Sequence, residues 1–144
     1  MVKPLHIHLA SILDSALNII NCSSGILMVV DEDRDELVFE VTKGPVGTSV
    51  QGERLPSNAG TAGKAYISQR PVITNHVDAN ALWFKDDHPK TAAKIKNIMT
   101  VPIIAHGRVI GVFELFNKQS DLPFNESDQK FLEVFANQAA VAIQ

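Results

Sequence analysis

The segment Asn97–Lys118, NIMTVPIIAHGRVIGVFELFNK, decides the fold of this chain. Its first half carries alternating apolar residues that share one face: Met99, Val101, Ile103 and Ala105. Its second half has two apolar faces, one with Val109, Gly111, Phe113 and Leu115 and the other with Ile110, Val112 and Phe116. A period of two residues on both sides of the Gly-containing turn His106-Gly107-Arg108 predicts an antiparallel β-hairpin. Because both faces of the second half are apolar, we expect this strand in the centre of a sheet covered on both sides.

One acidic residue interrupts the second apolar run. Glu114 stands between Phe113 and Leu115, where the pattern otherwise predicts a buried strand. A carboxylate in such a place needs a partner, solvent or a ligand, because removing an unpaired charge from water is costly. The hairpin therefore supplies a candidate functional residue in addition to a fold.

Composition places the chain among ordinary globular domains. Its 144 residues suit one domain with one core, and 45% hydrophobic with 20% charged residues is not the balance of a disordered chain. The net charge is −3 and the lysines and arginines are scattered, so we expect no nucleic-acid partner. The single cysteine, Cys22, rules out an internal disulfide and favours a reducing, cytoplasmic location.

Membrane contact is not predicted for this domain. The longest uninterrupted apolar run, Gly25–Val30, is far shorter than a bilayer span. The first residues lack the apolar core and the small-residue cleavage site of a signal peptide.

Hydrophobic spacing predicts a helix followed by two paired strands in the first third of the chain. Apolar residues recur at helical intervals from Leu5 to Ile20, so we expect an amphipathic helix that ends near Asn21. Gly25–Val30 is predicted as a buried strand, residues 31–35 as a polar turn, and residues 37–41 as a second strand that ends before Gly44-Pro45.

The middle of the chain has weaker signals. Gly44–Gly60 is poor in apolar residues and is predicted as a loop, with at most a short edge strand near Glu53–Leu55. A short helix over Gly60–Gln69 and a brief extended piece over Val72–Val77 follow. Ala79–Ile95 has mixed helical signals that Pro89 breaks.

A last helix is predicted after Pro123. Its main face is expected to contain Phe131, Phe135, Gln138 and Ala142, with Leu132, Val134, Ala139 and Val141 beside it. Asn125 and Asp128 have the spacing of a capping pair. The apolar pattern still runs at Gln144, so we expect a fragment of a longer signalling protein. Helices at both ends around an antiparallel sheet predict one α+β domain over residues 1–144.

Several motifs in order resemble the GAF domain family over nearly the whole chain. Gly60-Thr61-Ala62-Gly63 resembles the family's Gly-x-Ala-Gly segment at the start of a short helix, and Val101–Val112 resembles its central hairpin. The cyclic-nucleotide subgroup carries an Asn-Lys…Phe…Asp-Glu signature, which this chain nearly completes with Asn117, Lys118, Phe124 and Asp128. Gln129 stands where that signature has Glu.

The resemblance implies a fold and a class of function. The fold is a central antiparallel sheet of about five or six strands with helices on both sides, the first and last helices packed together. The function is a regulatory, non-enzymatic module that binds a small molecule between the sheet and residues 60–95. Such modules often form homodimers through the terminal helices and relay binding to a fused effector domain. A cyclic nucleotide is one ligand that the resemblance implies.

The resemblance also implies ligand contacts, each with a structural alternative. Glu114 lies near the base in nucleotide-binding relatives, or else it pairs with a neighbouring cation. Thr61 and Ala62 offer backbone N–H groups at a helix N-terminus to a phosphate, or else they form a small-residue turn that packs the helix. Ser24 and Thr91 are further ligand candidates, and Ser24 is equally an ordinary turn residue.

Trp83 has two interpretations of equal weight. It either anchors its polar segment to the core or forms a wall of the pocket, as aromatic residues often do.

Lys118 and Asp128 are implied to form a buried salt bridge between the last strand and the last helix. The alternative is that Asp128 complements a helix N-terminus while Lys118 is solvated. Asn117 and Phe124 belong to the same structural motif.

Two other functions stay open. The chain can be a dimerisation or scaffold domain without a ligand. It can also be a haem or redox sensor, since Asp87-His88-Pro89 resembles a His-Pro segment of haem-binding GAF sensors. An isolated histidine such as His88 is more often a surface residue, and Cys22 is interpreted as a small buried hydrophobe. No pair of histidines has zinc-ligand spacing, so no metal site is predicted.

Overall fold

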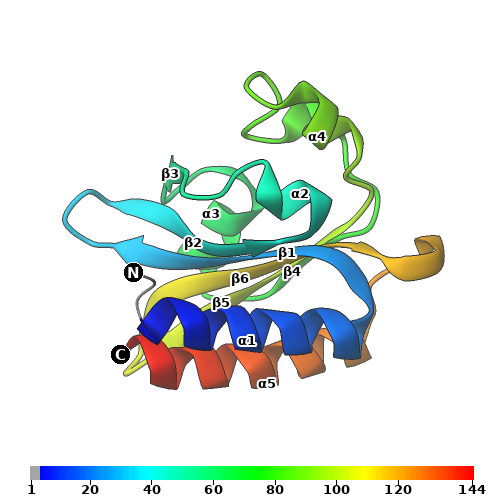
Figure 1. Cartoon of the computed structure of the whole chain (residues 1–144). Coiled ribbons are helices and arrows are strands. Elements are labelled where there is room, and N and C mark those ends of the chain that lie inside the picture. Colours follow the sequence, from blue (N-terminus) through cyan, green and yellow to red (C-terminus); the bar gives the residue numbers. More distant parts are fainter. Residues whose placement is uncertain (1–3) are drawn as a thin grey trace.

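The two apolar faces of the predicted hairpin become the two covered sides of an antiparallel sheet (Figure 1). The computed structural model describes residues 4–144. Six strands pair in the order β3-β2-β1-β6-β5-β4. Their bounds are β1 Cys22–Asp31, β2 Glu36–Lys43, β3 Arg54–Pro56, β4 Val72–Thr74, β5 Ile98–Ala105 and β6 Arg108–Lys118. The predicted α+β class with a central antiparallel sheet is confirmed, and β6 lies in the interior of the sheet as expected.

Helices cover the two faces unequally. Two long helices, α1 (Pro4–Ile20) and α5 (Glu126–Ile143), pack side by side on one face and run in opposite directions (Figure 1). The other face carries short elements: α2 (Gly44–Thr48), α3 (Gly60–Ser68), α4 (Pro89–Ala93) and the 3₁₀ turn η1 (Ala79–Ala81). A second 3₁₀ turn, η2 (Gln119–Asp121), leads from β6 to α5.

The sheet separates two hydrophobic cores. The first lies under α1 and α5 and includes Leu13, Met99, Phe113 and Leu132. The second lies on the opposite face and includes Met28, Phe39, Val112 and Phe116. A side chain on a central strand belongs to one core or the other, because successive residues point to opposite faces.

The hairpin turn is tighter than predicted, and an irregularity follows it. Strands β5 and β6 are joined by only two residues, His106 (φ 52°) and Gly107 (φ 76°). Positive φ at both central positions matches the right-handed twist of a hairpin. The pairing then shifts between Ile103 and Ile104, so that Ile110 on β6 is an extra residue.

This bulge corrects the predicted faces of β6. Val109 joins Val112 and Phe116 in the second core, whereas Ile110 packs against the first core with Phe113. The prediction instead placed Val109 on the face of Phe113, and Ile110 on the face of Val112 and Phe116. The reason is that one inserted residue reverses the alternation of everything between it and the turn.

The buried face of α5 also differs from the prediction. Its buried apolar residues are Leu132, Ala136, Ala139 and Ala140. Of the residues predicted for the core-facing side, Phe131, Val134 and Val141 are exposed by 50%, 55% and 70%. Three of these four buried residues are alanines, so small residues mark the buried face of α5 while larger apolar side chains lie outside.

Two local predictions in the middle of the chain are also corrected. Residues 44–48, predicted as loop, form α2, in which Gly44 adopts φ 79°. A side chain at Gly44 would collide with the Ser23 carbonyl, so only glycine fits there. Pro89, predicted to break a helix, is instead the first residue of α4, where its missing N–H costs nothing.

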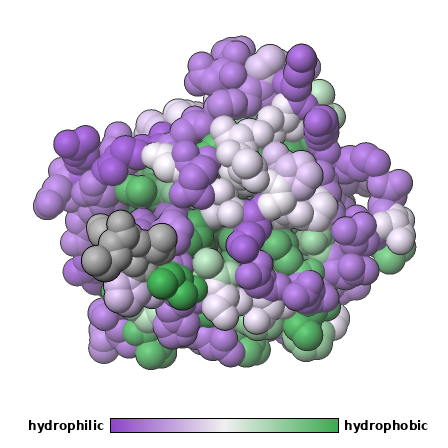
Figure 2. Space-filling model, in the orientation of Figure 1, coloured by the Kyte–Doolittle hydropathy of each residue, from purple (hydrophilic) through white to green (hydrophobic). Residues whose placement is uncertain are grey.

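Exposed apolar side chains gather on the layer formed by the two long helices. Figure 2 shows hydrophobic residues along its lower part, where α1 and α5 lie, interspersed with hydrophilic ones. The large apolar side chains left exposed on these helices are Ile7, Ile19, Phe131, Val134 and Val141. None of the helices in the described part of the chain has the length and apolarity to cross a bilayer.

Candidate functional site

A cavity of about 390 Å³ lies on the face of the sheet opposite the long helices. Its floor is formed by side chains of the sheet, among them Met28, Phe39 and Phe116. The start of α3 forms one wall. The other wall is the chain between β4 and β5, residues 75–97, which we call the cover segment and which contributes Leu82, Trp83 and Phe84 among others. The volume falls within the range of small-molecule pockets, and the side chains named here from its floor and walls are apolar or aromatic.

Glu114 is the acidic group in the floor of this cavity. The residue is 5% exposed, and its strand pairs place it between Ile26 of β1 and Thr100 of β5. The hydroxyl groups of Thr61 and Thr100 both donate to Oε2 of Glu114, each at 2.9 Å. Glu114 therefore ties the start of α3 to the sheet and presents a carboxyl group to the cavity.

The second carboxyl oxygen of Glu114 faces the cavity. Oε1 accepts no hydrogen bond from residues 4–144, and no fully buried side-chain oxygen in that range lacks a partner. Oε1 must therefore be in contact with the space inside the cavity. Burial raises the pKa of the Glu114 carboxyl above its ordinary value of 4.5, although the two threonine hydrogen bonds oppose this effect.

Glycines place the N-terminus of α3 against the cavity. Gly60 has φ 62°, a conformation that favours glycine. A Cβ at Gly63 would lie 2.4 Å from the backbone carbon of Asn58, so the turn before α3 packs directly on the helix. This close packing puts Thr61 and Ala62, both predicted site residues, in the cavity lining.

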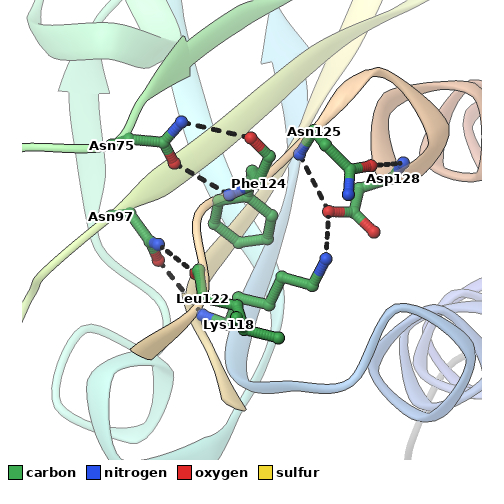
Figure 3. Close-up of polar contacts among 7 residues, drawn as sticks. All are labelled: Asn75, Asn97, Lys118, Leu122, Phe124, Asn125 and Asp128. Atoms are coloured by element: carbon green, nitrogen blue, oxygen red, sulfur yellow. Dashed lines mark hydrogen bonds and ion pairs between the residues drawn. The ribbon is translucent and has the colours of Figure 1, made fainter. Parts of the chain in front are cut away.

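Two asparagines fasten the ends of the cover segment to the chain that leads into α5 (Figure 3). Asn75 donates to the Phe124 carbonyl at 3.1 Å and accepts the Phe124 N–H at 2.8 Å. Asn97 donates to the Leu122 carbonyl at 2.9 Å and accepts the Lys118 N–H at 3.1 Å. Both ends of the cover segment are thereby joined to residues 118–124.

The same residues hold the first turn of α5. Lys118 Nζ lies 2.6 Å from Asp128 Oδ2, which also accepts the Asn125 N–H at 2.9 Å. The Asn125 side chain in turn accepts the Asp128 N–H at 2.9 Å, which completes a capping box. Asn117 bonds the cover segment through the Lys96 N–H and the Lys94 carbonyl, and the Phe124 ring is buried in the first core.

The structure does not bring all the predicted ligand residues together. Thr61, Ala62, Trp83 and Glu114 line the cavity, whereas Ser24 and Thr91 are absent from its described lining. The buried Ser24 hydroxyl instead accepts the Val46 N–H at 3.0 Å and supports α2. The Thr91 hydroxyl donates to Ser49 at 3.0 Å on the exposed side of α4.

His88 and Cys22 are also outside the cavity. Nε2 of His88 lies 2.8 Å from Glu53 Oε2, so this ring does not point where it could ligate a haem held in the cavity. Cys22 is buried in the first core, and burial together with the nearby Asp128 charge raises the pKa of its thiol to about 12. Among residues 4–144, no cluster of three histidine, cysteine, aspartate or glutamate side chains could hold a metal ion.

Three contributors to this arrangement carry no sequence signal of their own. Thr100 is an ordinary strand threonine, and only the shifted pairing of β5 with β6 sets it opposite Glu114. Asn75 and Asn97 flank a polar segment and look like turn residues until the fold brings residues 118–124 beside them.

The profile of the GAF domain family matches residues 3–144. The chain belongs to the GAF domain family. The cyclic-nucleotide subgroup, by contrast, is not distinguished by this match.

Solved structures place this GAF domain among diverse relatives. It is similar to a methyl-accepting chemotaxis protein, residues 122 to 287, with 23% identity, a TM-score of 0.80 and coverage of 96% of this chain and 88% of the other. It is similar to the second GAF domain of DevS from Mycobacterium smegmatis, with 21% identity, a TM-score of 0.75 and coverage of 97% and 93%. It also resembles free methionine-R-sulfoxide reductase from Neisseria meningitidis in complex with its substrate, with 22% identity, a TM-score of 0.73 and coverage of 94% and 77%. At these identities the likeness establishes the fold.

Proposed function

We propose that this GAF domain is a regulatory module that senses a small molecule and passes the binding signal to its long helices. The observation that carries the proposal is the cavity of about 390 Å³ in which Glu114 has one oxygen free for a ligand. A buried carboxyl without a charged partner is expensive to maintain for packing alone, and apolar surroundings with a few convergent polar groups are typical of ligand sites.

The relay follows from the fastening of the cover segment. A ligand in the cavity contacts the wall formed by Leu82, Trp83 and Phe84, and the ends of that wall are bonded to residues 118–124 at the entrance to α5. A ligand that binds more tightly when the cover segment is in one position than in another shifts the population of molecules toward the first position. The same shift reaches the Lys118–Asp128 contact and the packing of α5 on α1.

We propose that the output is carried by a homodimer. The exposed apolar side chains of α1 and α5 are candidates for burial against a second copy of this chain, since larger apolar patches mark interaction sites. In this proposal the terminal helices connect the domain to a fused effector in a longer, cytoplasmic signalling protein.

An enzymatic role has less support in the site. One similar structure is a methionine sulfoxide reductase, but the only cysteine here is buried away from the cavity with a thiol pKa of about 12. Because the thiolate is the nucleophile, this thiol is inert at neutral pH. The proposal therefore assigns binding and not catalysis to the cavity.

Cyclic nucleotides are the first specific ligands to test. The N-terminus of α3 offers backbone N–H groups to a phosphate, and Glu114 offers an oxygen to the edge of a base. Calorimetry and thermal shift with cyclic AMP and cyclic GMP on residues 1–144 test this version, and Glu114→Gln is the matched variant. Absence of heat and of a thermal shift at millimolar nucleotide would reject the nucleotide version, while another small molecule that binds in a Glu114-dependent way would preserve the sensory role.

A further inference from the structure

We propose that the cavity takes an organic cation, namely a ligand with a protonated amine, amidine or guanidinium group on an apolar body. This inference rests on the proposed function, since it names the class of small molecule that the cavity binds. Three observations lead to it: the unpaired state of Glu114, the aromatic walls, and the balance of charges in the lining.

Glu114 has hydrogen bonds but no counter-charge. Both threonine hydroxyls contact Oε2, and no lysine, arginine or histidine among residues 4–144 forms an ion pair with the carboxyl. The described ion pairs of this protein, including Lys118–Asp128, satisfy other carboxylates. A cationic ligand at Oε1 would supply the missing charge, and in a site shielded from water such a contact is strong.

Aromatic side chains line the same cavity as Glu114. Phe39 and Phe116 from the sheet and Trp83 and Phe84 from the cover segment all line the cavity. Their ring faces are electron-rich and attract cations, most strongly for tryptophan. The rings also supply apolar surface for the body of the ligand, so one pocket satisfies both parts of an amphipathic cation.

The remaining charges in the lining disfavour an anionic group beside Glu114, so a cyclic nucleotide could meet this carboxyl only with its uncharged base. Among residues 4–144, Lys64 is the only cationic residue that lines the cavity, and it is an exposed residue of α3. Glu114 and Asp78 are the acidic residues of the lining. An anionic ligand would approach Glu114 without a deep cation to hold it, and like charges in a poorly solvated site repel each other.

Three aromatic probes of similar size test the proposal: phenethylamine, phenethyl alcohol and phenylacetate, which are cationic, neutral and anionic at pH 7. Each is titrated into the chain by calorimetry, with thermal shift in parallel. We expect phenethylamine to bind at least about tenfold more tightly than the alcohol, and phenylacetate to be the weakest. Glu114→Gln should abolish this preference but keep the alcohol's affinity, because glutamine retains the size and the hydrogen bonds of the side chain.

Glu126→Gln is the control for a non-specific charge effect. It makes the same change of charge at an exposed residue of α5, 83% exposed and outside the cavity lining, and should leave phenethylamine binding unchanged. Equal affinity for the amine and the alcohol, or failure of the amine to bind, overturns the cation proposal. Binding of the alcohol or of phenylacetate under those conditions still supports a sensory cavity, whereas no binding by any probe or cyclic nucleotide counts against both proposals.

Discussion

Lys118 Nζ lies 2.6 Å from Asp128 Oδ2, and the two side chains are only 12% and 10% exposed. The contact joins the last residue of β6 to the first turn of α5 across the η2 turn. The same carboxylate accepts the Asn125 N–H, so a single oxygen serves an ion pair and a helix cap. Removing either partner leaves a buried charge without compensation, which is the costly way to break such a pair.

Asp128→Ala should therefore destabilise the domain strongly. We expect a loss on the order of 3–5 kcal/mol in the free energy of unfolding by urea, because Lys118 would be left unpaired. Asp121→Ala is the matched control, since the Lys96–Asp121 pair is 67% and 75% exposed and exposed pairs contribute about 0–1 kcal/mol. Equal losses in the two variants would show that the Lys118–Asp128 pair adds little.

Glu114 should make stability decrease with rising pH. Its folded pKa is raised above 4.5, so the folded state holds the proton over a pH range in which the unfolded state has released it. The corresponding stability is complete below pH 4.5 and is lost as pH rises through the folded pKa. Urea unfolding from pH 4 upward should show Glu114→Gln gaining stability relative to wild type as pH increases. Glu126→Gln, at an exposed pair, should track wild type, and parallel curves for both variants would contradict this role.

Cys22 should be unreactive in the folded protein. Its thiol is buried, and its pKa of about 12 leaves almost no thiolate at pH 8. Iodoacetamide should label the urea-unfolded chain fully and the native chain hardly at all over the same time. Native labelling at the unfolded rate would show that this part of the first core opens freely and would reopen the case for thiol chemistry.

Asn75→Ala should weaken both the cover segment and the start of α5. The substitution removes two hydrogen bonds to the Phe124 backbone, at 2.8 and 3.1 Å, and leaves those groups unsatisfied, which costs about 1–3 kcal/mol. Hydrogen exchange should become faster in residues 76–88 and also in residues 124–130. Asn80→Ala, an exposed change in the same segment, should leave α5 unaffected. Faster exchange confined to residues 76–88 would argue against the relay.

Charge on the exposed face of α5 should disrupt self-association. Phe131 and Val134 are 50% and 55% exposed, so Phe131→Glu with Val134→Glu should change the stability of the isolated fold by no more than about 0.5 kcal/mol per site. If the long helices form the dimer interface, sedimentation should move from dimer to monomer. Ile67→Glu on α3, 65% exposed on the other layer, is the control. A double variant that sediments like wild type would place the interface elsewhere.

The strands and the long helices could be predicted because their patterns are periodic. The helix over Leu5–Ile20 and the hairpin over Asn97–Lys118 are confirmed with small changes of boundary. The predicted faces of the side chains near the turn are wrong, because the alternation of apolar residues does not reveal a β-bulge. Symmetric pairing about His106-Gly107 would set Thr100 opposite Phe113, and the extra Ile110 moves it to Glu114. One inserted residue thus creates the hydrogen bond that orients the carboxyl group.

The cavity could be predicted only in part, for a related reason. Glu114 is evident as a charge in an apolar run, whereas Thr61 follows from the resemblance of Gly60–Gly63 to the GAF family segment. The resemblance alone points to Ser24 and Thr91 as ligand residues, but the Ser24 hydroxyl accepts the Val46 N–H and the Thr91 hydroxyl donates to Ser49. Contacts such as Asn75 with Phe124 join residues far apart in the chain, and no local pattern announces them.

The separation of the two cores by the sheet has an evolutionary consequence. Residues that shape the cavity, such as Phe39 and Phe84, belong to a different cluster from those that pack α1 on α5, such as Leu13 and Leu132. Substitutions in contact add poorly, whereas those in separate clusters add nearly independently. Ligand preference can therefore drift through exchanges on one side of the sheet while the helical layer keeps its packing, so one output surface can serve many chemical inputs.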